Sequence, residues 1–470
     1  MELLRHCILQ VNTICSERDI EDPRKIEEIN EYSGTCFRVK PTFLQNTPFF
    51  DEHKIFFVTN FHVCDDADNR EVYLRTAAMG KSMFTAHVEA VVPKLDVAIL
   101  SIEKDSSHTK WFLPKTPDTY LNKIKEATLW PKRVSSKTRK VSTIGFPQGL
   151  ENQVSSGWLA GRGSEEDDML QLNLSLNSGN SGGPLFDSKG NVIGVCTATL
   201  GDSEAISFAV PSFSVLNYFQ RFYKTPYGKF PQWGFTLLPM TEAYQKVHQI
   251  NGCGAVVKDV HHASSAAKIL KEGDVIHTIG EFDLDMFGLM KDETRGSKIT
   301  IHNTEFIMSL EDANITFSRK ASKQTVALMP EPIPFKVSEN FKEWCPTKVV
   351  EFGPFIFQNL SLNIMTSDAI PTGKNVRLLE IVKNTKSMQE IVIISKIDPN
   401  SYIASIETPE AYDQVISINR TKIKSIKDLK KAIEDIKRMH KGGEKYFNIN
   451  TTSGNMWFTI NKVLSKKRKR

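Results

Sequence analysis

A glycine-rich hexapeptide, GNSGGP at residues 179–184, carries the strongest chemical signal in the sequence. Its glycines permit a tight backbone turn, because glycine adopts left-handed conformations without steric cost. Such a turn presents Ser181 outward while nearby amides converge on one point, as stabilisation of an oxyanion requires. A plain tight turn between two strands would have the same sequence, so the hypothesis of a nucleophilic serine depends on finding partners for it.

A serine nucleophile needs a general base and a carboxylate that orients the base. His62 follows the apolar segment FFVTN at a point where the chain turns, and Asp96 precedes the apolar segment VAIL. Taken singly, His62 is one of 11 histidines, and an aspartate before a strand is more often a turn former. Together, the order His, Asp, Ser is that of the chymotrypsin-like barrels, not of the subtilisins or α/β-hydrolases.

These residues fall within a segment that reads as many short strands. From residue 36 to 210, apolar runs alternate with turn signals, which is the pattern of an all-β sandwich or barrel. The period then changes between residues 213 and 224, and this change predicts a short amphipathic helix. We therefore expect a first domain at 1–224.

Two smaller modules follow the first domain. Strand and helix patterns alternate from residue 233 to 329, a linker with three prolines covers 329–335, and a similar order of elements returns afterwards. We expect a first α/β module at 225–332, a second at 333–465 and a basic tail at 466–470. The names first module and second module are used below for these two segments.

Composition excludes several function classes. The chain has 470 residues, 40% of them hydrophobic and 24% charged, and its formal net charge of +5 equals the charge of residues 466–470 alone. A neutral body argues against a nucleic-acid binder. The seven cysteines include no CxxC pair, which argues against a zinc site, and no apolar run is long enough to span a membrane. We expect an intracellular protein with reduced thiols and no metal or cofactor.

The segments TNFHV, LDVAIL, IGFPQG and NSGNSGGPLFDSKGNVIGV resemble the HtrA (Deg) family of serine proteases. The segment GAVVKDVHHASSAAKILKEGDVIHTIG is similar to a PDZ domain of that family, and QVISINRTKIKSIKDLKKAI resembles the second half of another. The resemblance implies a chymotrypsin-like double β-barrel followed by two PDZ-like domains. Within the family, the sequence is most similar to the plant-type, intracellular branch, whose second PDZ domain is divergent.

This resemblance implies roles for individual residues. Ser181 would be the nucleophile, His62 the general base and Asp96 the residue that orients the imidazole. Gly179 and Ser181 would supply the oxyanion-hole amides, and Asn180 would shape the loop. No acid stands at Ser175, where a basic substrate side chain would be read, so we expect an apolar or small P1 residue. Six residues would line that pocket: Leu176, Asn177, Ile206, Ser207, Phe208 and Ala209. The alternative is that Leu176 and Phe208 belong to the core.

The PDZ resemblance implies capture of C-terminal peptides as an added strand. In the first module the carboxylate-binding loop would contain Trp233, Gly234 and Phe235. In the second module the corresponding loop contains Pro354, which lacks an amide donor, so a packing role between subunits is expected there instead. Members of the family are usually homo-oligomers built on trimers.

The expected activity is that of an ATP-independent serine endopeptidase that cleaves unfolded or PDZ-presented proteins in protein quality control. The alternative is a catalytically latent PDZ scaffold or a chaperone-like binding protein. The basic run KKRKR at the end of the sequence favours a nuclear over a cytoplasmic location, and the plant-type resemblance agrees.

Overall fold

The computed structural model divides the chain into two compact units, of which the first contains residues 1–14 and 31–333 and the second residues 15–30 and 334–470. Residues 15–30 thus group with the second unit rather than with the rest of the expected 1–224 domain. The structure describes the following residues: 2–65, 67–76, 83–104, 123–135, 137, 139–147, 153–164, 166–177, 179–199, 206–293, 296–320, 322–333, 348–361, 364–365, 367, 370, 373, 376, 378–379, 381–382, 390–406 and 409–464.

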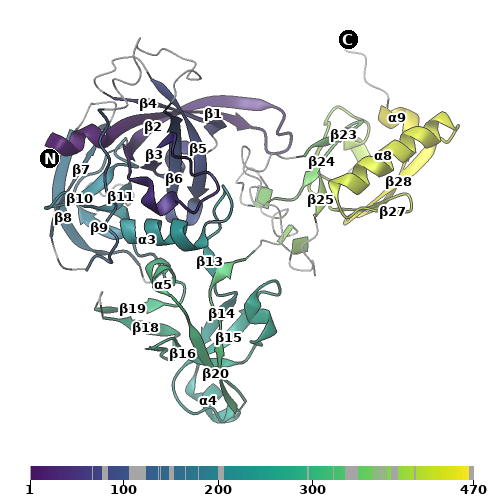
Figure 1. Ribbon diagram of the computed structural model, residues 1–470. Coiled ribbons are helices and arrows are strands. Elements are labelled where there is room, and N and C mark those ends of the chain that lie inside the picture. Colours follow the sequence, from purple (N-terminus) through teal and green to yellow (C-terminus); the bar gives the residue numbers. More distant parts are fainter. Residues whose placement is uncertain are drawn as a thin grey trace. The chain divides into compact units, whose positions relative to one another are not determined.

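Six strands close the first barrel in the order β1-β2-β3-β6-β5-β4 (Figure 1). The strand β6 shows why this segment folds as a barrel wall, because every residue of VAILSI is buried and only Glu103 is exposed. The barrel and its short helices have these bounds: η1 Glu2–Cys7, β1 Ile8–Arg18, β2 Ile26–Arg38, η2 Pro41–Leu44, β3 Lys54–Thr59, α1 Phe61–Cys64, β4 Ala67–Arg75, β5 Phe84–Val92, η4 Pro93–Leu95 and β6 Val97–Glu103.

Six further strands close a second barrel in the order β10-β11-β12-β9-β8-β7. Its elements are β7 Arg139–Gly145, β8 Gln153–Arg162, β9 Leu170–Asn173, β10 Pro184–Asp187, β11 Val192–Thr199 and β12 Ser207–Pro211, followed by α3 Ser212–Asn217 and the π-helical turn η7 Tyr218–Phe222. The two closed barrels confirm the predicted chymotrypsin-like double barrel. The helical pair α3–η7 lies where the sequence predicted an amphipathic helix.

The first module contains a sheet of order β14-β15-β16-β20-β21, and β17 also pairs with β16. A separate hairpin, β18–β19, precedes the short helix α5, which lies against α3 (Figure 1). The bounds are β13 Pro231–Gln232, β14 Phe235–Pro239, α4 Glu242–His248, β15 Ala255–Val260, η8 Ser265–Lys268, β16 Val275–Ile279, β17 Phe282–Asp283, β18 Leu289–Asp292, β19 Ser297–Thr300, α5 Thr304–Ser309, β20 Asn314–Arg319, β21 Ser322–Ala327 and β22 Glu331–Pro332.

The second module has two small sheets, β23-β24-β25 and β27-β26-β28-β29, and one long amphipathic helix, α8. Its core includes Phe355, Phe357, Phe447 and Phe458. The described elements are β23 Val350–Phe352, β24 Phe355–Asn359, β25 Val392–Ile397, η9 Ala404–Ile406, β26 Val415–Ile418, β27 Thr421–Lys422, α8 Ile426–Lys441, β28 Tyr446–Thr451, β29 Gly454–Thr459 and α9 Ile460–Leu464.

Both modules are small, β-rich and PDZ-like, as expected. The domain limits at residues 224 and 332 stay predictions, because the first compact unit holds both barrels and the first module. The basic tail at 466–470 lies outside the described residues. Among the described helices, none combines the length and apolar character needed to cross a membrane.

Candidate active site

The imidazole of His62 lies against the carboxylate of Asp96 at the rim of the first barrel. His62 lies on the four-residue helix α1, directly after β3, and Asp96 lies between η4 and β6. The Nδ1 atom of His62 lies 2.8 Å and 3.0 Å from the two carboxylate oxygens of Asp96. The His62 amide also donates to Asp96 Oδ1 at 3.0 Å. The ring is therefore held with Nε2 directed away from the carboxylate.

Backbone geometry fixes the Asp96 carboxylate in this place. Asp96 adopts a left-handed conformation with φ of 50°, in which aspartate is tolerated better than most residues. Its carbonyl accepts a hydrogen bond of 2.8 Å from Asn60 Nδ2, and Asn60 immediately precedes α1. Because β3 pairs with β6, the two segments that carry His62 and Asp96 leave the same edge of the barrel together.

Thr197, on β11, joins the two halves of the site and was missed by the sequence analysis. Its hydroxyl donates to Asp96 Oδ2, and its carbonyl accepts a hydrogen bond of 2.9 Å from Ser181 Oγ. The sequence VIGVCTAT offers no chemical signal that singles out this threonine. Its role arises from a contact between residues 101 positions apart.

The Ser181 hydroxyl is directed at the Thr197 carbonyl and not at the imidazole. Among the hydrogen bonds of the described residues, none joins Ser181 to His62. Rotation about the Cα–Cβ bond of Ser181 is therefore the step that would bring its hydroxyl to His62 Nε2, since the backbone of the loop is fixed by other contacts.

Those contacts come mainly from Thr35, on β2. The Thr35 amide donates to the Ser181 carbonyl at 2.8 Å, and the Thr35 hydroxyl donates to the Gly179 carbonyl at 2.6 Å. Two glycines make the close approach possible. Gly182 has φ of 85°, and a Cβ atom there would lie 2.0 Å from the Thr35 carbonyl oxygen. Gly179 has φ of 98°, and its Cβ would lie 2.3 Å from the Phe146 carbonyl oxygen.

The three loop amides differ in their availability. The Asn180 amide donates to the Asn177 carbonyl at 3.0 Å, so it is not available to an oxyanion. Among the backbone hydrogen bonds of the described residues, the amides of Gly179 and Ser181 have no acceptor. The side chain of Asn180 is buried, with both polar atoms lacking a protein partner. This residue therefore fills the space beneath the loop, whereas its two neighbours present N–H groups.

The six residues expected around the substrate side chain have different surroundings. Leu176 and Ala209 are buried in the core of the second barrel, so the core alternative holds for Leu176. Ser207 is fully buried and donates to the Leu174 carbonyl at 2.7 Å. Asn177 is exposed, and Ile206 and Phe208 are half-buried. Only these last three have surface to offer a substrate.

The expected carboxylate loop of the first module combines two buried aromatic residues with one glycine that has a positive φ. Trp233 and Phe235 belong to the hydrophobic core, and Trp233 Nε1 donates to the Ile301 carbonyl at 2.7 Å. Gly234 has φ of 78°, and a Cβ there would lie 2.3 Å from the side chain of Ser264. The strand after this loop, β14, pairs only with β15 among the described strands, so one of its edges is open.

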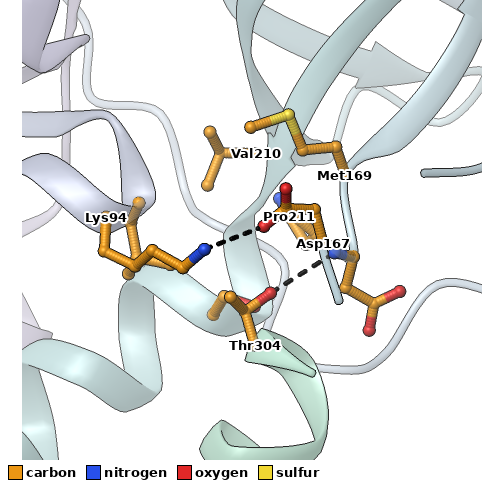
Figure 2. Close-up of a pocket in the computed structure, with 9 residues that line it drawn as sticks. Lys94, Asp167, Met169, Val210, Pro211 and Thr304 are labelled. Carbon is orange, nitrogen blue, oxygen red and sulfur yellow. Dashed lines mark hydrogen bonds and ion pairs between the residues drawn. The ribbon is translucent and has the colours of Figure 1, made fainter. Parts of the chain in front are cut away.

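A small pocket lies where the first module meets the second barrel, away from His62 and Ser181. Lys94 pairs with Asp167 at 3.2 Å (Figure 2). The Asp168 amide donates to Thr304 Oγ1 at 3.3 Å. Its lining comes from the segment before β6, the β8–β9 loop, β12, α3 and α5: Lys94, Leu95, Asp167, Asp168, Met169, Val210, Pro211, Ser214 and Thr304.

Buried charged side chains lie beside this pocket, where the first module contacts the second barrel. Glu305, on α5, is fully buried, 3.3 Å from Arg162 and 3.2 Å from Arg133. Arg133 also pairs with Asp292 at 2.6 Å, and Arg162 lies 3.5 Å from Asp168. Burial raises the pKa of Glu305, and the neighbouring Asp168 carboxylate raises it further.

Comparison with known proteins identifies the class of this site. Residues 34–195 match the family model described as a trypsin-like peptidase domain. The probable periplasmic serine endoprotease DegP-like of Chlamydia pneumoniae is 25% identical over 81% of this chain and 69% of its own length. The periplasmic serine endoprotease DegP of Salmonella typhimurium is 26% identical over 82% of this chain and 70% of its own length.

The trypsin-like domain makes this chain a serine-type peptidase, and over most of its length the chain is similar to serine endoproteases of the HtrA/DegP type. Escherichia coli DegP is 30% identical over 53% of this chain and 52% of its own length. A solved structure of the HtrA-type protease AlgW, a variant with a decapeptide, shares the fold with a TM-score of 0.50 and 19% identity, covering 71% of this chain and 97% of its own.

These relatives correct one prediction and leave another without support. The expected intracellular, nuclear location is wrong, because the DegP relatives are bacterial and are named periplasmic endoproteases. For the same reason the resemblance to the plant-type nuclear branch is not supported. The assignment to the serine peptidases is confirmed, and the relatives support the resemblance to the HtrA/Deg proteases.

Proposed function

We propose that Ser181, His62 and Asp96 form the catalytic triad of this peptidase. The observation that carries the proposal is the pair of short contacts between His62 Nδ1 and the Asp96 carboxylate, 2.8 Å and 3.0 Å. A carboxylate in this position fixes the tautomer that leaves Nε2 free to accept a proton, and it stabilises the imidazolium that forms. His62 is about half exposed, so a substrate can reach it.

The reaction begins when Ser181 Oγ leaves the Thr197 carbonyl and donates to His62 Nε2. Oγ then attacks the scissile carbonyl carbon while its proton moves to Nε2, and the carbonyl oxygen becomes an oxyanion. The amides of Gly179 and Ser181 donate to that oxyanion. Collapse breaks the C–N bond, and His62 gives its proton to the leaving amine. Water then attacks the acyl-enzyme carbonyl while His62 takes its proton, and collapse releases the carboxylic acid product and returns the proton to Ser181 Oγ. Each oxyanion donor contributes about 3 kcal/mol in comparable enzymes.

The substrate class proposed here is an extended polypeptide with an apolar or small P1 side chain. Ile206 and Phe208 offer half-buried apolar surface beside the second barrel, and Ser175 supplies no charge for a basic side chain. None of the proposed steps uses a nucleotide, so the endopeptidase would act without ATP on unfolded or PDZ-presented proteins. A trimer-based homo-oligomer stays a prediction.

The first module would supply presentation of substrates. Its β14 edge is open, and Gly234 turns the chain just before that strand, as strand addition with carboxylate capture requires. Leu238 on β14 is 45% exposed, which leaves apolar surface beside the open edge. We propose this edge as the site for C-terminal peptides.

A fluorophosphonate probe tests the triad, because it reacts only with a serine whose base and oxyanion hole are assembled. We expect one adduct on Ser181, located by mass spectrometry of the digested full-length protein. Ser181→Ala should lose both the adduct and casein digestion without a change in its unfolding midpoint. Ser188→Ala is the matched control, since Ser188 is exposed on the turn between β10 and β11.

Two results would separate the alternatives. Casein digestion by Ser181→Ala at the wild-type rate would refute the triad. Absence of the adduct in wild type, even with added hydrophobic C-terminal peptides, would favour the latent scaffold. The contact between the Ser181 hydroxyl and the Thr197 carbonyl is the observation that supports the latent scaffold.

A further inference from the structure

The turn between β1 and β2 is a rigid, acidic loop that groups with the second unit. We call residues 19–25 the hairpin tip. The Asp19 carboxylate accepts from the amides of Glu21 and Asp22 at 2.9 Å and 3.2 Å, and the Asp19 amide donates to the Lys25 carbonyl at 3.1 Å. Arg24 adds a two-point contact to Asp22, at 2.7 Å and 3.1 Å. The loop thus has one well-defined shape.

Two buried side chains of the second module donate to the backbone of the hairpin tip. Gln358 Nε2 donates to the Ile20 carbonyl at 2.9 Å, and Ser395 Oγ donates to the Glu21 carbonyl at 2.7 Å. Gln358 is 1% exposed and Ser395 is fully buried. A buried donor without an acceptor is costly, and the Ile20 carbonyl supplies the acceptor for Gln358. Ser395 Oγ also reaches the Ile356 carbonyl at 3.3 Å, but its shorter bond is to the hairpin tip.

Charges and apolar packing add to these bonds. Lys396 Nζ lies 2.7 Å from Asp19 and 3.1 Å from Glu21, and Arg24 pairs with Glu351 at 2.7 Å. The Ile20 side chain packs on a cluster of apolar residues in the second module: Leu360, Ile364, Ile370, Leu378, Ile381, Ile391, Ile393 and Tyr412. The contact therefore has a cation for the acids, donors for the backbone and an apolar cluster for Ile20.

In the second module, the strand that follows the expected carboxylate loop, β24, has no open edge. Its strand β24 pairs with β25 on one side and with β23 on the other, where Phe352 opposes Phe355 in a tight hairpin. Gly353 at this turn has φ of 60°. Since residues 355–357 are paired on both edges, a peptide cannot add there as a strand.

We propose that the second module is a receptor for the hairpin tip of its own chain rather than for a free C-terminal peptide. The ligand is the hairpin tip. The receptor surface is formed by Gln358, Ser395, Lys396 and the apolar cluster on which Ile20 packs. The tip continues directly into β2, the strand that also carries Thr35. Docking therefore tethers the second module to the strand that supports the nucleophile loop.

Zero-length carbodiimide cross-linking tests the contact and the identity of the occupant. The reagent joins a carboxylate to an amine only when they touch, and Lys396 lies within reach of Asp19 and Glu21. The full-length protein would be prepared as unlabelled and ¹⁵N-labelled chains, which are unfolded together, refolded and cross-linked. We expect a peptide linking Lys396 to Asp19 or Glu21 in which both halves carry the same isotope. Halves of mixed isotope would overturn the proposal by making the occupant a second copy of the chain.

Hydrogen exchange on full-length variants tests the energetics separately from catalysis. Lys396→Glu should accelerate exchange of the amides in the hairpin tip by at least about tenfold, because it places like charges at the contact. Lys422→Glu, an exposed reversal on β27 of the same module, should leave those amides unchanged. Unchanged exchange in Lys396→Glu, with the core amides of both variants intact, would overturn the proposal.

Discussion

At the scale of single residues, Thr197 is the least expected part of the site. One residue uses its hydroxyl to hold the Asp96 carboxylate and its carbonyl to hold the Ser181 hydroxyl. In the proposed triad, the first contact would support the orientation of the base, and the second directs the Ser181 hydroxyl to the Thr197 carbonyl instead of to the imidazole. Thr197 is thus a positioning residue that acts through both ends of the proposed triad.

Replacing Thr197 by valine should slow labelling of Ser181 by the fluorophosphonate probe. The variant keeps the carbonyl and the side-chain shape but removes one donor from a partly buried carboxylate. A hydrogen bond to a charged group contributes about 1.5–3 kcal/mol, so the rate should fall roughly 10- to 100-fold. Thr197→Ser keeps the donor and should label within a few-fold of wild type. Equal rates for the valine and serine variants would show that this hydroxyl does not position Asp96.

The same scale shows how much of the site the sequence could predict. His62, Asp96 and Ser181 stand at strand ends or in a glycine-rich turn, and these signals are local and readable. Thr197 is one of two threonines in β11, and only the closed barrel reveals its partners. Leu176 and Ala209 illustrate the converse limit, because an apolar residue near a site has the same sequence signal whether it lines a pocket or the core.

At the scale of elements, strand edges distinguish the two modules. The β14 edge of the first module is open, whereas β24 of the second module is paired on both sides. Sequence periodicity predicted the strands of both modules but could not predict which edges remain free, since pairing joins distant segments. The hairpin tip had no readable signal either, because a charged turn such as RDIEDPRK is typical of a solvated loop.

Peptide binding should therefore occur once per chain. Calorimetric titration of Ser181→Ala with an apolar C-terminal peptide should give one site per chain, and amidation of the peptide terminus should weaken binding at least about tenfold by removing the charge that the loop amides hold. Gly234→Ala should abolish the binding, because its Cβ would meet Ser264 at 2.3 Å. Gly280→Ala is the matched control, with φ of 57° and open space around it. Two sites per chain would contradict the closed edge of β24.

At the scale of the whole molecule, the first unit depends on buried charges where the first module meets the second barrel. Glu305 reaches Arg133 and Arg162, and the Thr304 amide donates to the Glu166 carbonyl at 3.2 Å. Arg221 adds donors to the carbonyls of Met308 and Leu310 beside α5. These contacts bind the helix α5 to the peptidase domain, so the stability of this contact should follow the protonation of Glu305.

The sign of that dependence follows from the raised pKa of Glu305. In the folded state the carboxyl group binds its proton more tightly than in the unfolded state, where its pKa is about 4.3. The stability it contributes is therefore complete at acid pH and is lost as the pH rises through the folded pKa.

We expect the unfolding midpoint of wild type to fall more steeply between pH 5 and pH 9 than that of Glu305→Gln, which keeps a neutral side chain throughout. Each kcal/mol corresponds to roughly 2–4 °C in a unit of this size. Glu281→Gln, an exposed change in the same module, should keep the wild-type slope. Parallel pH profiles for wild type and Glu305→Gln would mean that Glu305 is already ionised in the fold and that its two arginines outweigh its burial.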